Sequence, residues 1–326
     1  MALGIYFLCI KNTGEADMRI TIVGTGGVGG YFGGRLALAG NDVTFIARGA
    51  HLEAIQRDGL LVKSFMGEFT IKPAKATASI EAVKNADLVM ICTKAWQIKE
   101  IARQIAPLIY EGTMVLPLQN GISAIEELAE FIPKENIIGG LCRIFSKIEG
   151  PGIIDHQGID PTIIFSELDN EHTERTSWLK YTFESAGLTN IWSDDIQADL
   201  WKKFLMICSS GLLAITKTNY GELRSNPETR SMLNAMLTEI YTIAIAEGIN
   251  LHESIVEKTM KAIDSFPPES TSSLTRDVWE GKPSEIEYQN GTIVKLGEKH
   301  SIATPINTLI YNTILPMELK ARAKGD

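Results

Sequence analysis

A glycine-rich segment near the start of the chain limits its fold more than any other feature. Residues 22–29 read Ile-Val-Gly-Thr-Gly-Gly-Val-Gly. A β-rich run over 19–23 leads into the glycines, and a helix is predicted over 28–39. The GxGxxG pattern is weak alone, but between a strand and a helix it indicates a turn that binds a dinucleotide.

Each glycine of this turn has a mechanical role. Gly24 permits the tight turn, Gly26 lets the backbone approach a pyrophosphate, and Gly29 lets the helix pack closely on the strand. The free N–H groups at the start of the helix favour an anion. A glycine-rich turn without a ligand is the alternative. We expect the cofactor to bind at Gly24, Thr25, Gly26, Gly27, Val28 and Gly29.

Strands and helices alternate through the first part of the chain. Further strands are predicted over 42–47, 88–93, 113–117 and 188–192, and helices over 97–108 and 171–186. After Gly139 the pattern changes to short strand-like pieces separated by glycine turns. Such alternation is typical of α/β proteins, so we predict an N-terminal Rossmann-like, doubly wound sheet.

The rest of the chain has helical periodicity and no convincing strand. Helices are predicted near 195–216, 227–248, 252–265, 283–300 and 304–321. The length of 326 residues also exceeds what a single core usually fills. We therefore predict a Rossmann domain over 18–193 and an all-α C-terminal domain over 194–326, with residues 1–17 as a peripheral N-terminal extension.

Composition argues against several classes of partner. The formal net charge of −9 repels phosphate backbones and anionic lipids, so neither nucleic acid nor a membrane is expected. The apolar run over 3–10 is too short to span a bilayer, and we expect a cytoplasmic protein. The isolated cysteines predict buried thiols and no metal site. The apolar helices over 227–248 and 304–321 are expected to complete the core, with a homodimer face as the alternative.

The second predicted strand ends without a carboxylate. An NAD-specific site places Asp or Glu there, where it accepts a hydrogen bond from the ribose 2′-hydroxyl. Here the strand ends in Ile46-Ala47-Arg48-Gly49, and Arg48 can form charge-assisted hydrogen bonds with a 2′-phosphate. The sequence therefore favours NADP over NAD, unless Arg48 is only a solvated surface charge.

Short motifs follow the glycine turn through nearly the whole chain. They are Ala47-Arg48-Gly49, Thr93-Lys94-Ala95-Trp96-Gln97, Gln119-Asn120-Gly121, Leu200-Trp201-Lys202-Lys203, Gly221-Glu222-Leu223-Arg224, Ser272-Ser273 and Glu285-Ile286-Glu287-Tyr288-Gln289-Asn290-Gly291. In order and spacing they resemble those of the ketopantoate reductase (2-dehydropantoate 2-reductase) family. No single motif is specific, but together they are.

The resemblance implies the reduction of a 2-oxo acid with NADPH. It places Lys94 and Asn120 at the cofactor and the catalytic cleft, and Lys203 at the ketone oxygen. By the same resemblance Glu285 supports Lys203, and Ser273 binds polar groups of the substrate. Lys94 and Asn120 each follow a predicted strand, which suits this role because ligands of open α/β sheets bind at the carboxyl ends of strands.

A lysine at the ketone oxygen also suits the chemistry. Hydride attack builds negative charge on this oxygen, and a protonated amine stabilises the charge and can deliver the proton. The reference pKa of lysine, about 10.4, keeps the amine protonated unless it is desolvated. A carboxylate such as Glu285 would oppose that desolvation shift. A solvated charge on an amphipathic helix is the alternative for Lys203.

The helix that carries Lys203 departs from the family pattern. The family has substrate-binding asparagines where this chain has Ile207, Gly211 and Tyr220. Ile207 and Gly211 follow Lys203 at spacings of about one turn and are predicted to form an apolar wall of the substrate site. A substrate hydroxyl against this wall would stay unpaired at a cost of ~1–3 kcal/mol. We expect a substrate that is bulkier or less hydroxylated than ketopantoate.

The leading hypothesis is an NADPH-dependent reductase of a 2-oxo acid, either 2-dehydropantoate in the pantothenate pathway or a related, less hydroxylated acid. One alternative is another NADP-linked hydroxy acid dehydrogenase, because some of these also combine a Rossmann domain, an all-α domain and a catalytic lysine. The other is a non-catalytic NADP sensor. The joint presence of Lys203, Asn120 and Glu285 argues against a sensor, which needs no proton donor.

Overall fold

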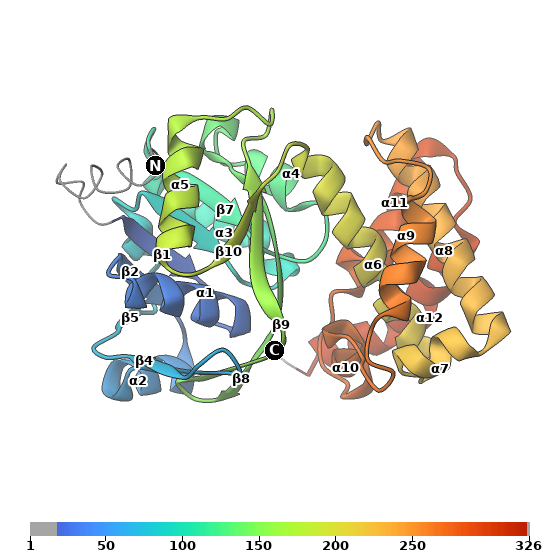
Figure 1. The fold of residues 1–326 in the computed structure, drawn as a ribbon, viewed down its shortest axis with the longest axis horizontal. Coiled ribbons are helices and arrows are strands. Elements are labelled where there is room, and N and C mark those ends of the chain that lie inside the picture. The colour runs from blue at the N-terminus through green and yellow to red at the C-terminus, as the bar shows by residue number, and fades with distance from the viewer. Residues whose placement is uncertain (1–17, 325–326) are drawn as a thin grey trace, which may run out of the picture.

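Two parts lie side by side in the computed structural model, which describes residues 18–324 (Figure 1). Strands and helices mix in the first part, and helices make up the second. The predicted N-terminal extension, residues 1–17, lies outside the described residues. The first part ends with strand β10 (Thr189–Trp192) and the second begins with helix α6 (Ile196–Thr216), so the boundary predicted after residue 193 falls between them.

A parallel sheet forms the centre of the first part. Its strands lie in the order β5-β2-β1-β6-β7, and all neighbouring pairs are parallel. β6 and β7 are buried along their whole length, as parallel strands covered on both faces are. The predicted Rossmann-like fold is confirmed. The elements are β1 (Arg19–Val23), β2 (Asp42–Ile46), β5 (Lys75–Thr77), β6 (Leu88–Ile91) and β7 (Met114–Pro117), with α1 (Gly27–Leu38), α2 (Gly49–Asp58), α3 (Ile98–Ile105) and α4 (Ala124–Ala129).

A second sheet completes the first part, and α1 packs against strands of both sheets. Its strands run in the order β10-β9-β3-β4, with β8 paired to β9. The expectation of short strand-like pieces after Gly139 is wrong, because this segment forms two long antiparallel strands. Irregular register between Arg143 and Phe145 and near Gly150 interrupts the side-chain alternation that would reveal them. The elements are β3 (Leu60–Ser64), β4 (Phe69–Ile71), β8 (Gly139–Gly150) and β9 (Ile153–Ser166), with α5 (Glu174–Ser185).

Helices alone make up the second part over the described residues 194–324. The predicted helix over 283–300 is interrupted, because residues 286–288 form a separate 3-10 turn, η7 (Ile286–Tyr288). The N–H and the hydroxyl of Ser284 both donate to Glu318, which anchors the segment before η7 to the last helix. The remaining helices are α7 (Tyr220–Ser225), α8 (Pro227–Ala246), α9 (Ile255–Asp264), α10 (Ser273–Trp279), α11 (Asn290–His300) and α12 (Pro305–Arg322).

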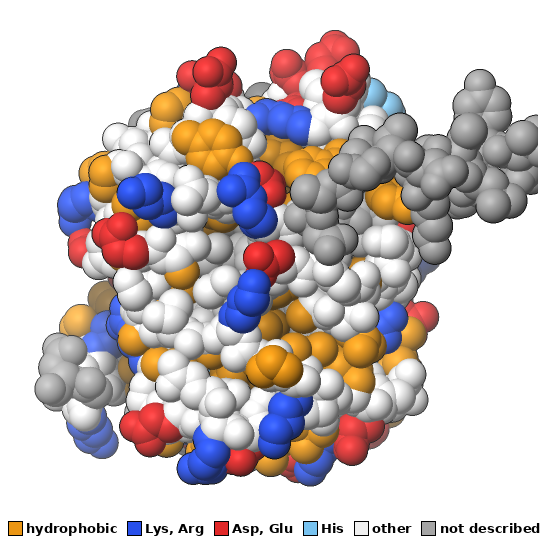
Figure 2. Space-filling model, turned by 90° about the vertical axis from the view of Figure 1, so that its left-hand side faces the viewer, with side chains coloured by type: hydrophobic (Ala, Val, Ile, Leu, Met, Phe, Trp, Pro, Cys, Tyr) orange, Lys and Arg blue, Asp and Glu red, His pale blue; other side chains and the backbone are white. Residues whose placement is uncertain are grey.

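Charges of both signs lie on the end of the molecule that the α/β part forms. Figure 2 shows acidic, basic and apolar side chains interspersed on this face. The charges visible on this face are mixed and do not form one continuous area of a single sign.

Within residues 18–324, no helix is long and apolar enough to cross a membrane.

Helix α6 joins the hydrophobic cores of the two parts. Its first turns place Ile196 and Leu200 in the cluster that contains β6 and β7. Further along, Phe204 and Cys208 belong to the core of the helical part. The Asp195 carboxylate accepts a hydrogen bond from the Ala198 N–H (2.9 Å) and caps the helix. Residues in the middle of α6 therefore lie at the junction of the two parts.

Gly211 allows α6 to pack closely against two helices of the second part. A Cβ atom at this position would overlap the Asn290 side-chain oxygen on α11 and the Ile310 Cγ2 on α12. Gly211, Asn290 and Ile310 are all buried. Because none of them can move toward solvent, we infer that Gly211 is a packing position of the helical core.

We predict that Gly211→Ala lowers the free energy of unfolding by about 1–3 kcal/mol, because the added methyl group overpacks a closed core. Urea unfolding followed by circular dichroism measures this change. Gly150→Ala is the matched control, since a Cβ there meets no atom within 4 Å. A Gly211→Ala variant as stable as the wild type would contradict the packing role.

Candidate active site

The candidate site lies where four strands of the parallel sheet end. β1, β2, β6 and β7 are mutually aligned, so their carboxyl ends share one edge. Gly24, Arg48, Lys94 and Asn120 follow these ends. This edge is where open α/β sheets bind ligands, and the predicted residues of the first part therefore gather at one place.

The glycine turn has the geometry expected for a phosphate cradle. Gly24 has φ +96°, which favours glycine, and a Cβ there would lie 2.7 Å from Thr93 Cγ2. A Cβ on Gly29 would overlap the Gly24 carbonyl oxygen, and one on Gly27 would overlap the backbone of Ser146 in β8. A Cβ on Gly26 would meet no atom within 4 Å. Gly26 thus borders open space, while the other glycines allow tight packing.

The turn also offers free donors beside this space. Helix α1 begins at Gly27, and the N–H groups of Gly27 and Val28 donate to no acceptor within the described part of the chain. Unpaired N–H groups at a helix N-terminus attract anions. Arg48, at the end of β2, is exposed and has no ion-pair partner among residues 18–324.

Thr25 anchors the turn. Its N–H (3.1 Å) and its hydroxyl (3.0 Å) both donate to the Ile46 carbonyl at the end of β2. Its own carbonyl oxygen lies 2.8 Å from His51 Nε2 on α2. The hydroxyl is buried and already paired, so Thr25 fixes the turn rather than offering this group to a ligand. His51, which lies one turn after Arg48, was not predicted from the sequence.

Glu285 joins the two parts at the centre of the site. Its side chain is buried, and one carboxylate oxygen accepts from the Ala95 N–H (3.1 Å) after β6. The other accepts from the Asn120 amide nitrogen (3.0 Å) after β7. Gly121 has φ +103° and packs against the Tyr288 carbonyl oxygen. Asn120 and Glu285, predicted from distant motifs, are thus in direct contact.

Lys203 lies close to Glu285 in the middle of α6. Burial lowers the pKa of Lys203, the neighbouring Cys142 thiol and the Glu285 carboxylate oppose this shift, and Arg143 adds to it. Within the described residues, the Lys203 amine has no hydrogen-bond or ion-pair partner. Cys142 and Arg143 in β8 were not predicted as neighbours, because the sequence gives no sign that β8 faces α6. The amine is therefore half-buried, without a partner among the described residues, and within electrostatic range of a fixed carboxylate.

Lys94, which follows β6, contacts α10, the helix that begins at Ser273. Lys94 Nζ pairs with Asp277 on α10 (3.2 Å) and lies over the Trp96 ring. Ser273 is exposed, one helical turn before Asp277 on the same face of α10. The Ser273 hydroxyl has no hydrogen bond to any residue over 18–324. Lys94 is thus partly engaged by Asp277, a partner that the sequence did not indicate.

The three positions where the chain departs from the family do not form one wall. Ile207 is half-buried, one turn after Lys203. Gly211 faces Asn290 and Ile310 inside the helical core, so the expectation that it lines the substrate wall is not supported by its packing. Tyr220 is buried, and its hydroxyl shares a hydrogen bond with Ser209 (3.1 Å). Of the three, only Ile207 remains a candidate for the predicted apolar wall.

Several buried polar atoms near this edge lack a partner in the described chain. They are Thr93 Oγ1 after β6, Gln119 Oε1 after β7 and Ser146 Oγ in β8. Thr93 and Ser146 belong to the surroundings of the glycine turn. Because unpaired buried polar groups are costly, these oxygens are available to pair with a polar ligand at this edge.

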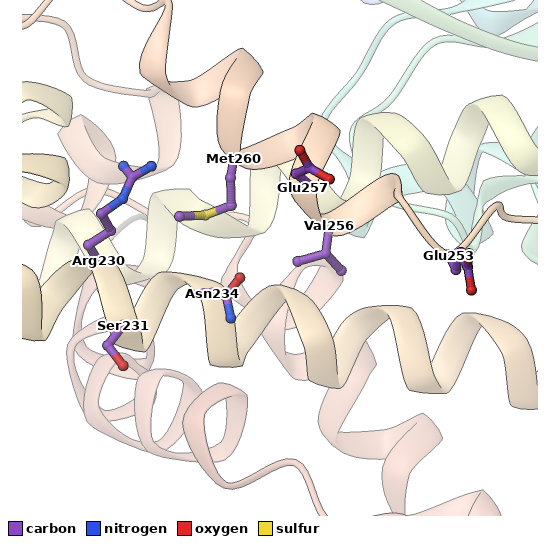
Figure 3. A pocket seen from close by; sticks show the side chains of 7 residues that line it. All are labelled: Arg230, Ser231, Asn234, Glu253, Val256, Glu257 and Met260. Carbon is purple, nitrogen blue, oxygen red and sulfur yellow. The ribbon is translucent and has the colours of Figure 1, made fainter.

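A separate groove lies on the helical part, between α8 and α9 (Figure 3). Arg230 and Asn234 line it from α8, and Glu257 and Met260 line it from α9. None of the predicted site residues lines this groove. Its surroundings are therefore distinct from the site at the sheet edge.

Comparisons with known proteins identify the family to which the chain is similar. The family described as Ketopantoate reductase PanE/ApbA matches residues 20–170, and its C-terminal family matches residues 195–318. The Uncharacterized oxidoreductase YkpB of Bacillus subtilis is 30% identical over 90% of this chain and 97% of its own length. A 2-dehydropantoate 2-reductase of Pyrococcus horikoshii is 31% identical over 92% and 98% of the two chains.

Solved structures extend the similarity to the fold. A PanE/ApbA family ketopantoate reductase from Ralstonia eutropha has a TM-score of 0.86 at 29% identity, covering 94% of this chain and 100% of that one. A D-mandelate dehydrogenase, solved with NADH and anilino(oxo)acetate, has a TM-score of 0.84 at 25% identity with the same coverage. The chain belongs to the ketopantoate reductase family of oxidoreductases.

Proposed function

We propose that this enzyme reduces a 2-oxo acid with NADPH, and that 2-dehydropantoate or a less hydroxylated relative is its substrate. The observation that carries this proposal is the Lys203 amine. It is half-buried and without a partner among residues 18–324, and it lies beside Glu285, which is fixed by Ala95 and Asn120. An amine so placed can hold a proton at a substrate oxygen.

The sheet edge fits a nicotinamide dinucleotide. The open space at Gly26 and the free N–H groups of Gly27 and Val28 suit its pyrophosphate. The unpaired Thr93 and Gln119 oxygens can accept hydrogen bonds from a carboxamide. Arg48 can pair with a 2′-phosphate, which favours NADPH over the NADH that accompanies the similar D-mandelate dehydrogenase. The bound cofactor would supply the hydride.

Lys203 would perform the proton chemistry of the reduction. Its ammonium group donates a hydrogen bond to the ketone oxygen, stabilises the negative charge that develops there and delivers the proton. Burial lowers the pKa of Lys203 and so favours its neutral form, and the Glu285 carboxylate opposes this effect. Arg143, exposed and unpaired in the described chain, brings a second positive charge near Lys203 that suits the carboxylate of a 2-oxo acid.

Ile207 favours a second candidate, a 2-oxo acid with an apolar side chain. This residue follows Lys203 by one turn and offers no hydrogen bond to a substrate hydroxyl. The D-mandelate dehydrogenase neighbour was solved with anilino(oxo)acetate, which carries an aromatic ring. Both observations favour an apolar group beyond the carbonyl, as opposed to the hydroxyl of 2-dehydropantoate.

Replacing Lys203 tests the proposed chemistry. We predict that Lys203→Ala lowers kcat for 2-oxo acid reduction by about 100- to 10,000-fold, the usual contribution of a general acid, with NADPH affinity unchanged. Oxidation of NADPH measured by absorbance, and NADPH binding measured by fluorescence, give the two quantities. Lys202→Ala is the matched control, because Lys202 is exposed and paired with Asp199.

The pH dependence of the rate provides a second readout. Since the protonated amine is the active form, kcat/KM should fall as the pH rises through the pKa of Lys203, which burial lowers. Lys203→Arg, which stays protonated, should lack this alkaline decline. Full activity of Lys203→Ala would refute the assigned role. NADPH binding by the wild type without reduction of any 2-oxo acid would favour the sensor alternative.

Arg48 tests the choice of cofactor. We predict that Arg48→Gln raises the KM for NADPH about tenfold to 100-fold, because charge-assisted hydrogen bonds to the 2′-phosphate are lost. The KM for NADH should change less than about twofold, since NADH has no such phosphate. Equal losses for both cofactors, or a wild-type preference for NADH, would contradict the proposed specificity.

Ile207 tests the choice of substrate. We predict that Ile207→Asn shifts the ratio of kcat/KM for 2-dehydropantoate over phenylglyoxylate about tenfold toward 2-dehydropantoate, because the amide can pair with its hydroxyl. The ratio within one variant cancels losses of folded enzyme. A wild type that prefers 2-dehydropantoate by orders of magnitude would disprove the apolar wall.

A further inference from the structure

His51 links the glycine turn to the hairpin that joins β8 and β9. Its Nε2 lies 2.8 Å from the Thr25 carbonyl oxygen. On the opposite side of the ring, the Gly152 N–H donates to Nδ1 (3.0 Å). His51 lies on α2, so its ring joins three segments that are distant in the sequence.

These two contacts fix the protonation of the ring. A backbone N–H can only donate, so Nδ1 must accept and carries no hydrogen. The Thr25 carbonyl can only accept, so the hydrogen must be on Nε2. Together these two contacts define a neutral ring. Burial lowers the pKa of His51 and favours the same form, while the backbone groups of Thr25 and Gly150 oppose this shift. His51 thus acts as a fixed donor to Thr25.

The hydrogen bond from His51 to the Thr25 carbonyl also sets the direction of the next amide group, the Gly26 N–H. The Thr25–Gly26 peptide is planar and trans, so the Thr25 C=O and the Gly26 N–H point in opposite directions. Because the carbonyl is held toward His51, the Gly26 N–H is directed away from α2. A Cβ on Gly26 would meet no atom within 4 Å, so the residue borders the open space of the cradle.

The hairpin residue Gly152, on the opposite side of the His51 ring, is also held by other contacts. The Gly152 carbonyl accepts from the Leu61 N–H (2.9 Å) in β3, and Gly152 packs against Ala54 on α2. The hairpin turn is thus held by a neighbouring strand and a helix. Its position fixes the His51 ring, which in turn fixes the peptide of the glycine turn.

We propose that His51 is a positioning residue for the dinucleotide, which holds the Thr25–Gly26 peptide so that the Gly26 N–H can bind the pyrophosphate. This inference rests on the proposed binding of a nicotinamide dinucleotide. It deepens that proposal by assigning a role to a residue that contacts neither the cofactor nor the substrate. It applies equally to NADPH and NADH, which share the pyrophosphate.

Three substitutions separate the two contacts of the ring. His51→Ala removes both, His51→Gln can keep a donor near the Nε2 position, and His51→Asn can keep only an acceptor near Nδ1. We expect His51→Ala and His51→Asn to raise the Kd of NADPH and of NADH about three- to tenfold, the effect of one hydrogen bond. His51→Gln should restore most of the affinity. For all three variants, kcat at saturating cofactor should stay within about twofold of the wild type.

Adenosine 2′-monophosphate is the discriminating probe, because it lacks the pyrophosphate but retains the group expected at Arg48. Its Kd, measured by calorimetry, should be unchanged in every His51 variant. The control His252→Ala removes an exposed histidine from the helical part and should change no Kd. Equal weakening of adenosine 2′-monophosphate and NADPH, or no rescue by His51→Gln, would indicate a merely structural role and overturn the proposal.

The outcomes also separate this inference from the proposed function. A His51→Ala variant that binds both dinucleotides as tightly as the wild type would refute only the role of His51. A wild-type protein that binds neither dinucleotide would refute the proposed function and this inference with it.

Discussion

The buried carboxylate of Glu285 holds the candidate site together. Its two oxygens accept from Ala95 and Asn120, which follow neighbouring strands of the sheet, while Glu285 itself belongs to the helical part. A buried carboxylate without such partners would cost several kcal/mol, so these hydrogen bonds favour contact between the two loops and the helical part. Lys203 lies close to this carboxylate, and its electrostatic surroundings depend on the same contact.

The two parts contribute different functions to the site. The sheet edge provides backbone donors, open space at Gly26 and the Arg48 charge, all of which suit a dinucleotide. The helical part provides Lys203, Ser273 and Ile207, which suit a carbonyl substrate. Helix α6 belongs to the cores of both parts, so it can hold an amine at their junction without a flexible linker.

Local patterns in the sequence were enough to predict much of the fold and the site. They could not predict contacts between residues that are far apart in the chain. The glycine turn was predictable because strand, turn and helix are adjacent in the chain. The family resemblance placed Asn120 and Glu285 in one site, but their direct contact was not predicted, since no local pattern joins two residues so far apart. Gly211 was misplaced because a helix turns about 100° per residue, so a position eight residues on points about 80° away from Lys203. The contact between His51 and the Thr25 carbonyl was not predicted from the sequence, because it depends on the packing of α2.

In the proposed reaction, the Lys203 amine faces the reacting carbonyl across the junction of the two parts. A crystal structure with NADP⁺ and oxamate, an unreactive analogue of a 2-oxo acid, tests it most directly. The account predicts Lys203 Nζ about 3 Å from the carbonyl oxygen of oxamate, on the side of the nicotinamide ring. An amine that faces bulk water, with no ligand oxygen within hydrogen-bond distance, would contradict the assigned chemistry even if the dinucleotide were bound at the glycine turn.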